Sequence, residues 1–152
     1  MPTIYAATTD NRLEGGPNSS WDGVRDATAA GLSTVTDQSS NIAAGASIFT
    51  GRGSATFKIW RSFFHFDTSG ITGTLSAATL KLRFSNQLGD GNVIIIKSDA
   101  FTGGSDALTT TDFNNLDFST PYSGEVDTST DALTSITLNA TAAADIKNNN
   151  DF

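Results

Sequence analysis

Apolar and polar residues alternate along several short stretches of this chain, and a period of two residues predicts β-strands. The clearest case is residues 78–84, where Leu80, Leu82 and Phe84 fall at every second position with polar or cationic residues between them. Because successive side chains of a strand point to opposite faces, the three apolar side chains share one face. We predict a half-buried strand with Leu80 and Leu82 in the core.

Residues 57–66 form a second strong pattern, because aromatic side chains fall on both faces of the expected strand. This arrangement predicts a central strand that is covered on both sides for part of its length. Residues 93–97 have too few polar positions for an exposed edge strand. We expect the following side chains to be mostly buried: Ile59, Phe63, Leu80, Leu82, Phe84, Ile94 and Ile96.

Turn residues divide the rest of the chain into short elements. Between residues 21 and 50 the pattern is ambiguous, and Trp21 and Val24 could start a strand. We predict strands at residues 3–8, 34–37, 46–50 and 136–138; turns or loops at 10–11, 15–20, 51–53 and 89–92; and short helical pieces at 111–116 and 140–147, the second capped by Asn139. This pattern predicts one all-β domain over residues 1–152, an antiparallel β-sandwich or jelly roll with one or two short helices.

The number and placement of charged residues limit the kinds of partner that the protein is expected to bind. Charged residues make up 16% of the chain, well below the usual quarter, and the formal net charge is −7. The nine basic residues are scattered singly, so we expect binding neither to nucleic acid nor to an anionic membrane. The first residues have no basic and apolar leader pattern, which predicts no signal peptide. The longest strongly apolar run, residues 93–96, is too short to cross a bilayer.

The residue types of common catalytic sites are scarce. His65 is the one histidine, cysteine is absent, and no nucleophile or phosphate-loop motif occurs. We therefore predict that the protein is not an enzyme and that His65 packs among the aromatic residues around it. We expect no cofactor. The sequence allows one metal, a structural Ca²⁺, with residues 89–92 and Asp10-Asn11 as the candidate loops, because hard cations bind loop oxygens.

Two aromatic residues are candidates for stacking on sugar rings, Trp21 and Tyr122. Trp21 follows a loop rich in Gly, Pro, Asn and Ser and precedes Asp22, which favours exposure. The alternative for Trp21 is packing onto the edge of the sandwich. Trp60 alternates with Phe64, and we predict that it belongs to the core.

The stretches 61–71 and 75–82 together resemble a signature of DNRLRE-type β-sandwich domains. In that signature, an Arg-Ser pair and two hydrophobic residues precede a Phe-Asp pair, and a Ser-Ala pair then precedes an alternating Leu-x-Leu. The matching residues are Arg61, Phe66, Asp67, Leu80 and Leu82. Such domains are jelly-roll modules of secreted proteins, and some bind polysaccharides. In this chain, Arg61 is expected to pair with Asp67 or with a carbonyl, while Phe66, Leu80 and Leu82 fill the core.

The pattern from Ile4 to Ile71 is also similar to small virion structural proteins of tailed phages. That resemblance implies a structural subunit on the outer surface of the virion, either a capsid decoration (cement) protein or a fibre-associated subunit. Its partners would be capsid or tail proteins and further copies of itself, with a homotrimer as the first choice by analogy. The alternative is a polysaccharide-binding module of an extracellular protein, which would bind surface glycans.

Domains of the DNRLRE type normally continue past the last helix with one or two strands, whereas this sequence stops at Phe152. Three explanations stay open. The sandwich closes differently, the sequence is a fragment, or a neighbouring chain supplies the missing strand. The third explanation predicts an open sheet edge that another protein covers.

Overall fold

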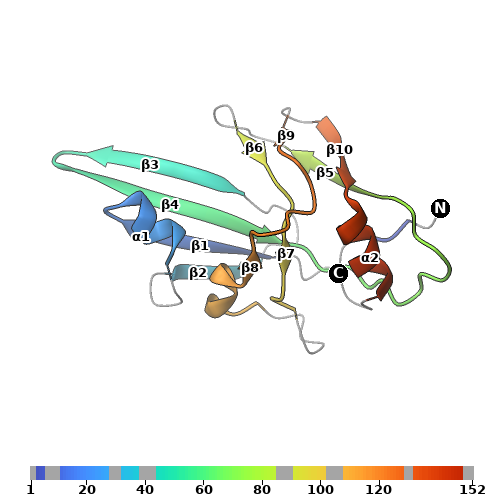
Figure 1. Ribbon diagram of the computed structural model, residues 1–152. Coiled ribbons are helices and arrows are strands. Elements are labelled where there is room, and N and C mark those ends of the chain that lie inside the picture. Colours follow the sequence, from blue (N-terminus) through green and yellow to red (C-terminus); the bar gives the residue numbers. More distant parts are fainter. Residues whose placement is uncertain are drawn as a thin grey trace. The chain divides into compact units, whose positions relative to one another are not determined.

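The computed structural model describes residues 3–5, 11–27, 32–37, 44–84, 91–101, 108–128 and 132–148. Over these residues the chain is mainly β-strand, its main strand pairs are antiparallel, and two short α-helices accompany them (Figure 1). The predicted mainly-β character is therefore confirmed.

The chain forms two compact units that alternate along the sequence. The sheet unit comprises residues 5–66 and 98–116, and the C-terminal unit comprises residues 1–4, 67–97 and 117–152. The chain leaves the C-terminal unit at β7 (Lys97–Ser98) and returns to it at β8 (Leu116–Asp117). Each unit has a hydrophobic core of its own.

The sheet unit contains a four-stranded antiparallel sheet in the order β2-β1-β4-β3. Its strands are β1 (Asn11–Asn18), β2 (Leu32–Asp37), β3 (Gly45–Gly51) and β4 (Ser54–Phe63). The predicted strands 34–37 and 46–50 are thus confirmed, and the predicted turn at 51–53 joins β3 to β4. The predicted central strand within 57–66 is confirmed as β4, which pairs with β1 on one side and β3 on the other.

In the N-terminal third, one prediction was wrong and one ambiguous segment is helical. The expected loop at 15–20 is partly strand, because β1 runs through Gly15 and Gly16 and shifts its register there. Pairing with Leu32 on one side and Ile59 on the other holds Gly15 in the strand, despite its weak intrinsic preference for strand. Gly16 has a φ of 105° and lies in the irregular stretch before Asn18. Trp21 begins helix α1 (Trp21–Arg25) rather than a strand, since Ser20 caps the helix.

The core of the sheet unit lies where β1 and β4 meet the short 3-10 helix η2 (Thr110–Asn114). Leu13 and Phe113 are fully buried there, and Phe63 is 4% exposed. The predicted helical turn at 111–116 is confirmed in substance, and its start is capped by Thr109 and Asp112. Ile59, predicted as core, is half-buried and packs against this cluster.

The C-terminal unit is built on β5 (Ala78–Phe84), β10 (Ala132–Leu138) and α2 (Ala140–Asn148). β5 pairs antiparallel with β10, and β6 (Asn92–Val93) pairs with β9 (Val126–Asp127). Asn139 caps α2 as predicted, its side-chain oxygen accepting the N–H of Ala142 at 3.0 Å. The core side chains are Tyr122, Ile136, Leu138, Ala142 and Ile146, with Leu80 and Leu82 half-buried against them.

Three further predictions differ from the structure. The expected strand at 93–97 is interrupted, because only Val93 and Lys97 lie in strands, β6 and β7. Ile94, predicted as core, is 42% exposed, whereas Ile95 packs into the C-terminal core. Residues 3–5 of the predicted first strand are not in a strand, and the rest of that segment lies outside the described residues. The expected turn at 89–92 falls mostly outside them too.

Candidate interaction surface

Strand β3 is the outer strand of the sheet unit, and in the part of the chain that the structure describes no strand pairs with its second edge. Its sequence is Gly-Ala-Ser-Ile-Phe-Thr-Gly, with no charged residue and no proline. Ile48 is 61% exposed and Phe49 is 53% exposed. Natural edge strands are usually protected by charge, proline or a bulge, and β3 has none of these.

The hairpin that places β3 at the edge follows from its glycines. Gly51 pairs with Ser54 across the turn residues Arg52 and Gly53. Gly53 has a φ of 101°, which side-chain-bearing residues rarely adopt. The register then sets Ile48 opposite Phe57 and Phe49 opposite Thr56. Because paired residues share a face, the two exposed apolar side chains of β3 lie on opposite faces of the sheet.

Helix α1 brings Trp21 to the face that carries Ile48 and Phe57. The Oγ of Ser20 accepts the N–H of Gly23 at 3.0 Å, which fixes the start of the helix. A side chain at Gly23 would lie 2.7 Å from the side-chain ends of Asn18 and Ser20, which would have to shift and disturb the cap. Trp21 contacts Phe57 edge to face, with ring centroids 6.2 Å apart, and remains 40% exposed.

A shallow apolar hollow of about 550 Å³ lies between α1 and the hairpin. Its lining consists of Trp21, Ala46, Ser47, Ile48 and Phe57. The Oγ of Ser47 is buried without a hydrogen-bond partner among the described residues, and the pairing of Ser47 with Lys58 places that side chain on the face opposite Ile48. The hollow and the open edge of β3 together form one surface, which we call the β3 surface.

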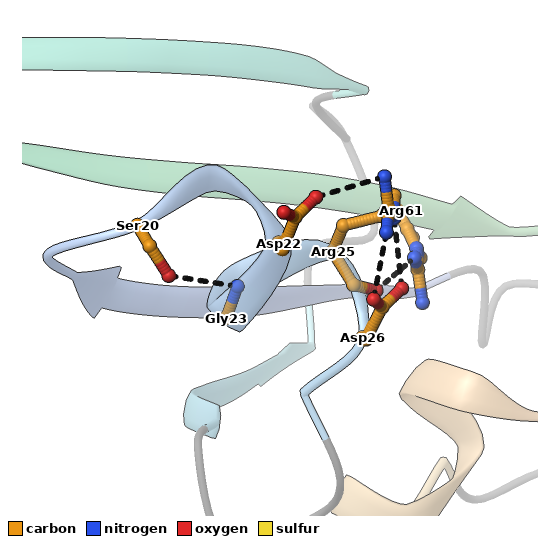
Figure 2. Close-up of polar contacts among 6 residues, drawn as sticks. All are labelled: Ser20, Asp22, Gly23, Arg25, Asp26 and Arg61. Atoms are coloured by element: carbon orange, nitrogen blue, oxygen red, sulfur yellow. Dashed lines mark hydrogen bonds and ion pairs between the residues drawn. The ribbon is translucent and has the colours of Figure 1, made fainter.

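A cluster of charged side chains holds α1 against the sheet (Figure 2). Arg61 on β4 donates to the backbone carbonyl of Arg25 at 2.9 Å and to that of Phe113, and its guanidinium lies 4.0 Å from the centre of the Phe113 ring. Arg61 therefore links β4, the end of α1 and η2. Burial lowers the pKa of Arg61, against the attraction of Asp26.

Arg25 itself makes ion pairs with two neighbours on the surface. It lies 3.0 Å from Asp22 and 2.7 Å from Asp26 (Figure 2). The hydrogen bond between Arg25 and Asp26 raises the pKa of Arg25 and lowers that of Asp26. Because these groups are exposed, the pairs order the helix end and add little to stability.

The opposite face of the sheet carries a half-buried ion pair. The carboxylate of Glu14 accepts from Lys58 at 2.5 Å and from the indole N–H of Trp60 at 3.0 Å. Burial raises the pKa of Glu14, but the bonds from Lys58 and Trp60 outweigh it, and the net pKa is lowered. The ammonium of Lys58 also lies 5.9 Å from the ring centre of Phe49. Phe49 is thus supported from its own sheet and open on its outer side.

The two predicted glycan-binding residues have different environments. Trp21 is exposed, as expected, and its ring also packs edge to face on Phe57 of β4. Tyr122 is 4% exposed, with its hydroxyl hydrogen-bonded to Asp145. A buried ring presents no face for a sugar, so this position contradicts the expected availability of Tyr122 for stacking.

The residues of the predicted signature serve structural contacts. Arg61 donates to carbonyls, which is one of the two partners expected for it. Asp67 accepts the N–H of Ser69 at 3.0 Å within its own turn. Leu80 and Leu82 pack against the C-terminal core, as predicted, and Phe66 is half-buried.

The predicted calcium loops cannot be located in full, because Asp10 and Asp90 lie outside the described residues. Among the residues that are described, no three His, Cys, Asp or Glu side chains gather into a group able to hold a metal. His65 is half-buried, and its ring lies 5.4 Å from that of Phe101, an aromatic neighbour distant in the sequence. Within the same described residues, no helix is long and apolar enough to span a membrane.

Ile48 and Phe49 are the surface residues that sequence reasoning missed. The strand itself was predicted, but its place at the edge depends on pairing with distant strands, which a local pattern does not contain. The available signal was the pair of adjacent apolar residues in an uncharged strand bounded by glycines. Comparison of the chain with protein-family models, with curated proteins and with solved structures gives no match.

Proposed function

We propose that this protein is a structural subunit that acts by binding other protein chains through the β3 surface. The observation that carries the proposal is the open edge of β3, with Ile48 and Phe49 exposed on opposite faces. A strand that is apolar on both faces and has no charge resembles the central strands of a sheet. Strand addition from a partner would give β3 that environment and satisfy its outer backbone groups.

We further propose that the assembly is the outer surface of a tailed-phage particle, with the chain as a capsid decoration or fibre-associated subunit of the β-sandwich or jelly-roll type. The support is the similarity of the pattern from Ile4 to Ile71 to small virion structural proteins of tailed phages, together with the net charge of −7. A negative charge suits a surface that faces away from packaged nucleic acid. The partners would be capsid or tail proteins and other copies of the chain, for which a homotrimer is the choice by analogy.

The test begins with purified particles from the source of the sequence. Mass spectrometry should find the chain as a stoichiometric component, and antibodies against it should label intact particles. In particles made with substituted chains, Ile48→Glu should abolish incorporation. Leu133→Glu is the matched control, because Leu133 is 59% exposed on β10 in the other unit. Absence of the chain from the particles would contradict the phage role, and equal incorporation of both variants would contradict binding through β3.

The second candidate function is polysaccharide binding, and the exposure of Trp21 above an apolar hollow favours it. An exposed indole beside Phe57 offers an apolar face on which a sugar ring can stack. Titration of the protein with soluble polysaccharides, followed by tryptophan fluorescence, should then show saturable binding that Trp21→Ala removes. Tyr5→Ala is the control, since Tyr5 is 84% exposed. Equal affinity of both variants would exclude Trp21 as a glycan residue.

A further inference from the structure

We propose that the occupant of the β3 edge is a second copy of this chain, paired antiparallel with β3 about a two-fold axis that passes between the two Ile48 residues. This inference rests on the proposed function and names the partner of the same surface. The result is a continuous sheet in which the strand order β2-β1-β4-β3 of one copy is followed by the reverse order of the other. The evidence comes from comparing the sequence of β3 with the same sequence in the reverse direction, as it would lie in an antiparallel second copy.

β3 is matched in size to its own reversed copy. A register centred on Ile48 sets the two Ile48 residues opposite each other and the terminal glycines, Gly45 and Gly51, opposite one another. The same register sets the bulky Phe49 opposite the small Ser47, and Thr50 opposite the small Ala46. Large side chains therefore face small ones on each side of the axis, an alternation that lets facing side chains interdigitate. Two identical strand edges that pair antiparallel are related by a two-fold axis.

The exposed apolar residues would be buried on both faces of this paired sheet. On one face, the two Ile48 side chains would meet at the axis beside the hollow that Trp21 and Phe57 line. On the other face, each Phe49 would lie against Ser47 of the second copy. One contact thus covers both residues that make β3 unusual among edge strands, Ile48 at 61% and Phe49 at 53% exposure.

Electrostatics does not oppose the contact, even though each copy carries a net charge of −7. β3 has no charged residue of its own. Arg52, in the turn that follows, would fall opposite Ala44 of the second copy. Lys58, on the neighbouring strand, is held by Glu14. The strand at the contact therefore adds no charge repulsion of its own.

The geometry favours a second copy over an unrelated partner because the contact is self-complementary and closed. Each copy covers the open edge of the other, and no β3 edge remains to recruit a third chain. A trimer, the choice by analogy, would need a contact between two different surfaces. Strand pairing at β3 predicts a dimer instead.

Sedimentation of the purified protein over a dilution series tests the assembly. The wild-type chain should have twice the chain mass of 15.9 kDa, and so should the control Leu133→Glu. Ile48→Glu should be monomeric, because two carboxylates would oppose each other at the axis, and Ile48→Lys should be monomeric for the same reason. An equimolar mixture of these two variants should recover the dimer, since it places opposite charges across the axis. Near-UV circular dichroism checks that each variant is folded.

A disulfide trap tests the register. The chain has no cysteine, so each introduced thiol is alone in its copy. Ile48→Cys should form a covalent dimer on mild oxidation, because residues directly opposite each other in an antiparallel pair lie about 4.5–5.5 Å apart at Cα, within disulfide range. Thr50→Cys should not, because the two thiols would be four residues out of register, about 14 Å along the strands.

A wild-type monomer, a trimer that Ile48→Glu leaves intact, or equal crosslinking at positions 48 and 50 would overturn the pairing. Such a failure is separable from failure of the proposed function. If the chain is monomeric but Ile48→Glu still prevents incorporation into particles, the edge binds a different protein and only the self-pairing falls. If Ile48→Glu changes neither the mass nor the incorporation, both proposals fall.

Discussion

Replacement of Gly15 by alanine should destabilise the sheet unit, and replacement of Phe113 should partly relieve the damage. Gly15 lies in β1 at a backbone conformation open to any residue. A methyl group there would overlap Cζ of Phe113 and lie 3.0 and 3.1 Å from the two neighbouring ring carbons. The ring cannot move away easily, because Phe113 is fully buried and the guanidinium of Arg61 lies 4.0 Å from its centre.

The size of the effect follows from two opposing terms. Overpacking of a well-packed core costs about 1–3 kcal/mol. Exchange of glycine for alanine without strain stabilises a protein by about 0.4–1 kcal/mol through the unfolded chain. We therefore expect Gly15→Ala to lower the free energy of unfolding by about 1–2 kcal/mol. Phe113→Leu, which removes the tip of the ring, should cost a similar amount on its own through lost burial, about 1–2 kcal/mol.

The double variant decides whether the ring contact is the cause. If it is, the methyl group of Ala fills the space that Phe113→Leu opens, and the combined loss should be smaller than the sum of the single losses by about 1 kcal/mol. Urea unfolding followed by tryptophan fluorescence measures this, because both tryptophans of the chain, Trp21 and Trp60, belong to the sheet unit. A neutral Gly15→Ala, or losses that simply add, would refute the reasoning.

Two further predictions concern a carboxylate and a helix cap. Because the pKa of Glu14 is lowered in the folded chain, its contribution to stability is present above its ordinary pKa of about 4.3 and lost as the pH falls through the lowered value. The difference in urea midpoint between wild type and Glu14→Gln should therefore shrink below about pH 4.3, and a constant difference would contradict it. Asn139→Ala should destabilise the C-terminal unit by about 1 kcal/mol or more, because it removes the cap on Ala142 and the bond to the carbonyl of Pro121. Thermal unfolding followed by near-UV circular dichroism of Tyr122 measures this, and Asn148→Ala, at the far end of α2, should be nearly neutral.

The elements that the sequence predicted well are those whose signal is local. The alternation in residues 78–84 coincides with β5, and Asn139 predicted the start of α2 because a cap acts on the next few residues. β1 could not be predicted, because Gly15 and Gly16 favour a loop locally, and Gly15 joins the strand only through pairing with β2 and β4. The prediction that Ile94 is buried was wrong, because an apolar run shows that its residues avoid water on average. It does not show which of them points into the core.

The candidate surface was predictable in part for the same reason. The exposure of Trp21 followed from the loop before it and from Asp22 after it, both local features. The exposure of Ile48 did not, since the same strand would be buried at the centre of a sheet and open at its edge. The burial of Tyr122 was equally nonlocal, because it depends on α2, which brings Asp145 to the tyrosine hydroxyl.

The residues of the DNRLRE-type signature are divided between the two units. Arg61 and Phe66 lie in the sheet unit, whereas Asp67, Leu80 and Leu82 lie in the C-terminal unit. Arg61 fastens α1 and η2 to β4, and the two leucines fill a different core. The continuous stretch of sequence therefore contributes packing residues to each of the two units. The residues of the signature account for why the chain folds, and the proposed function depends instead on β3, which lies outside the signature.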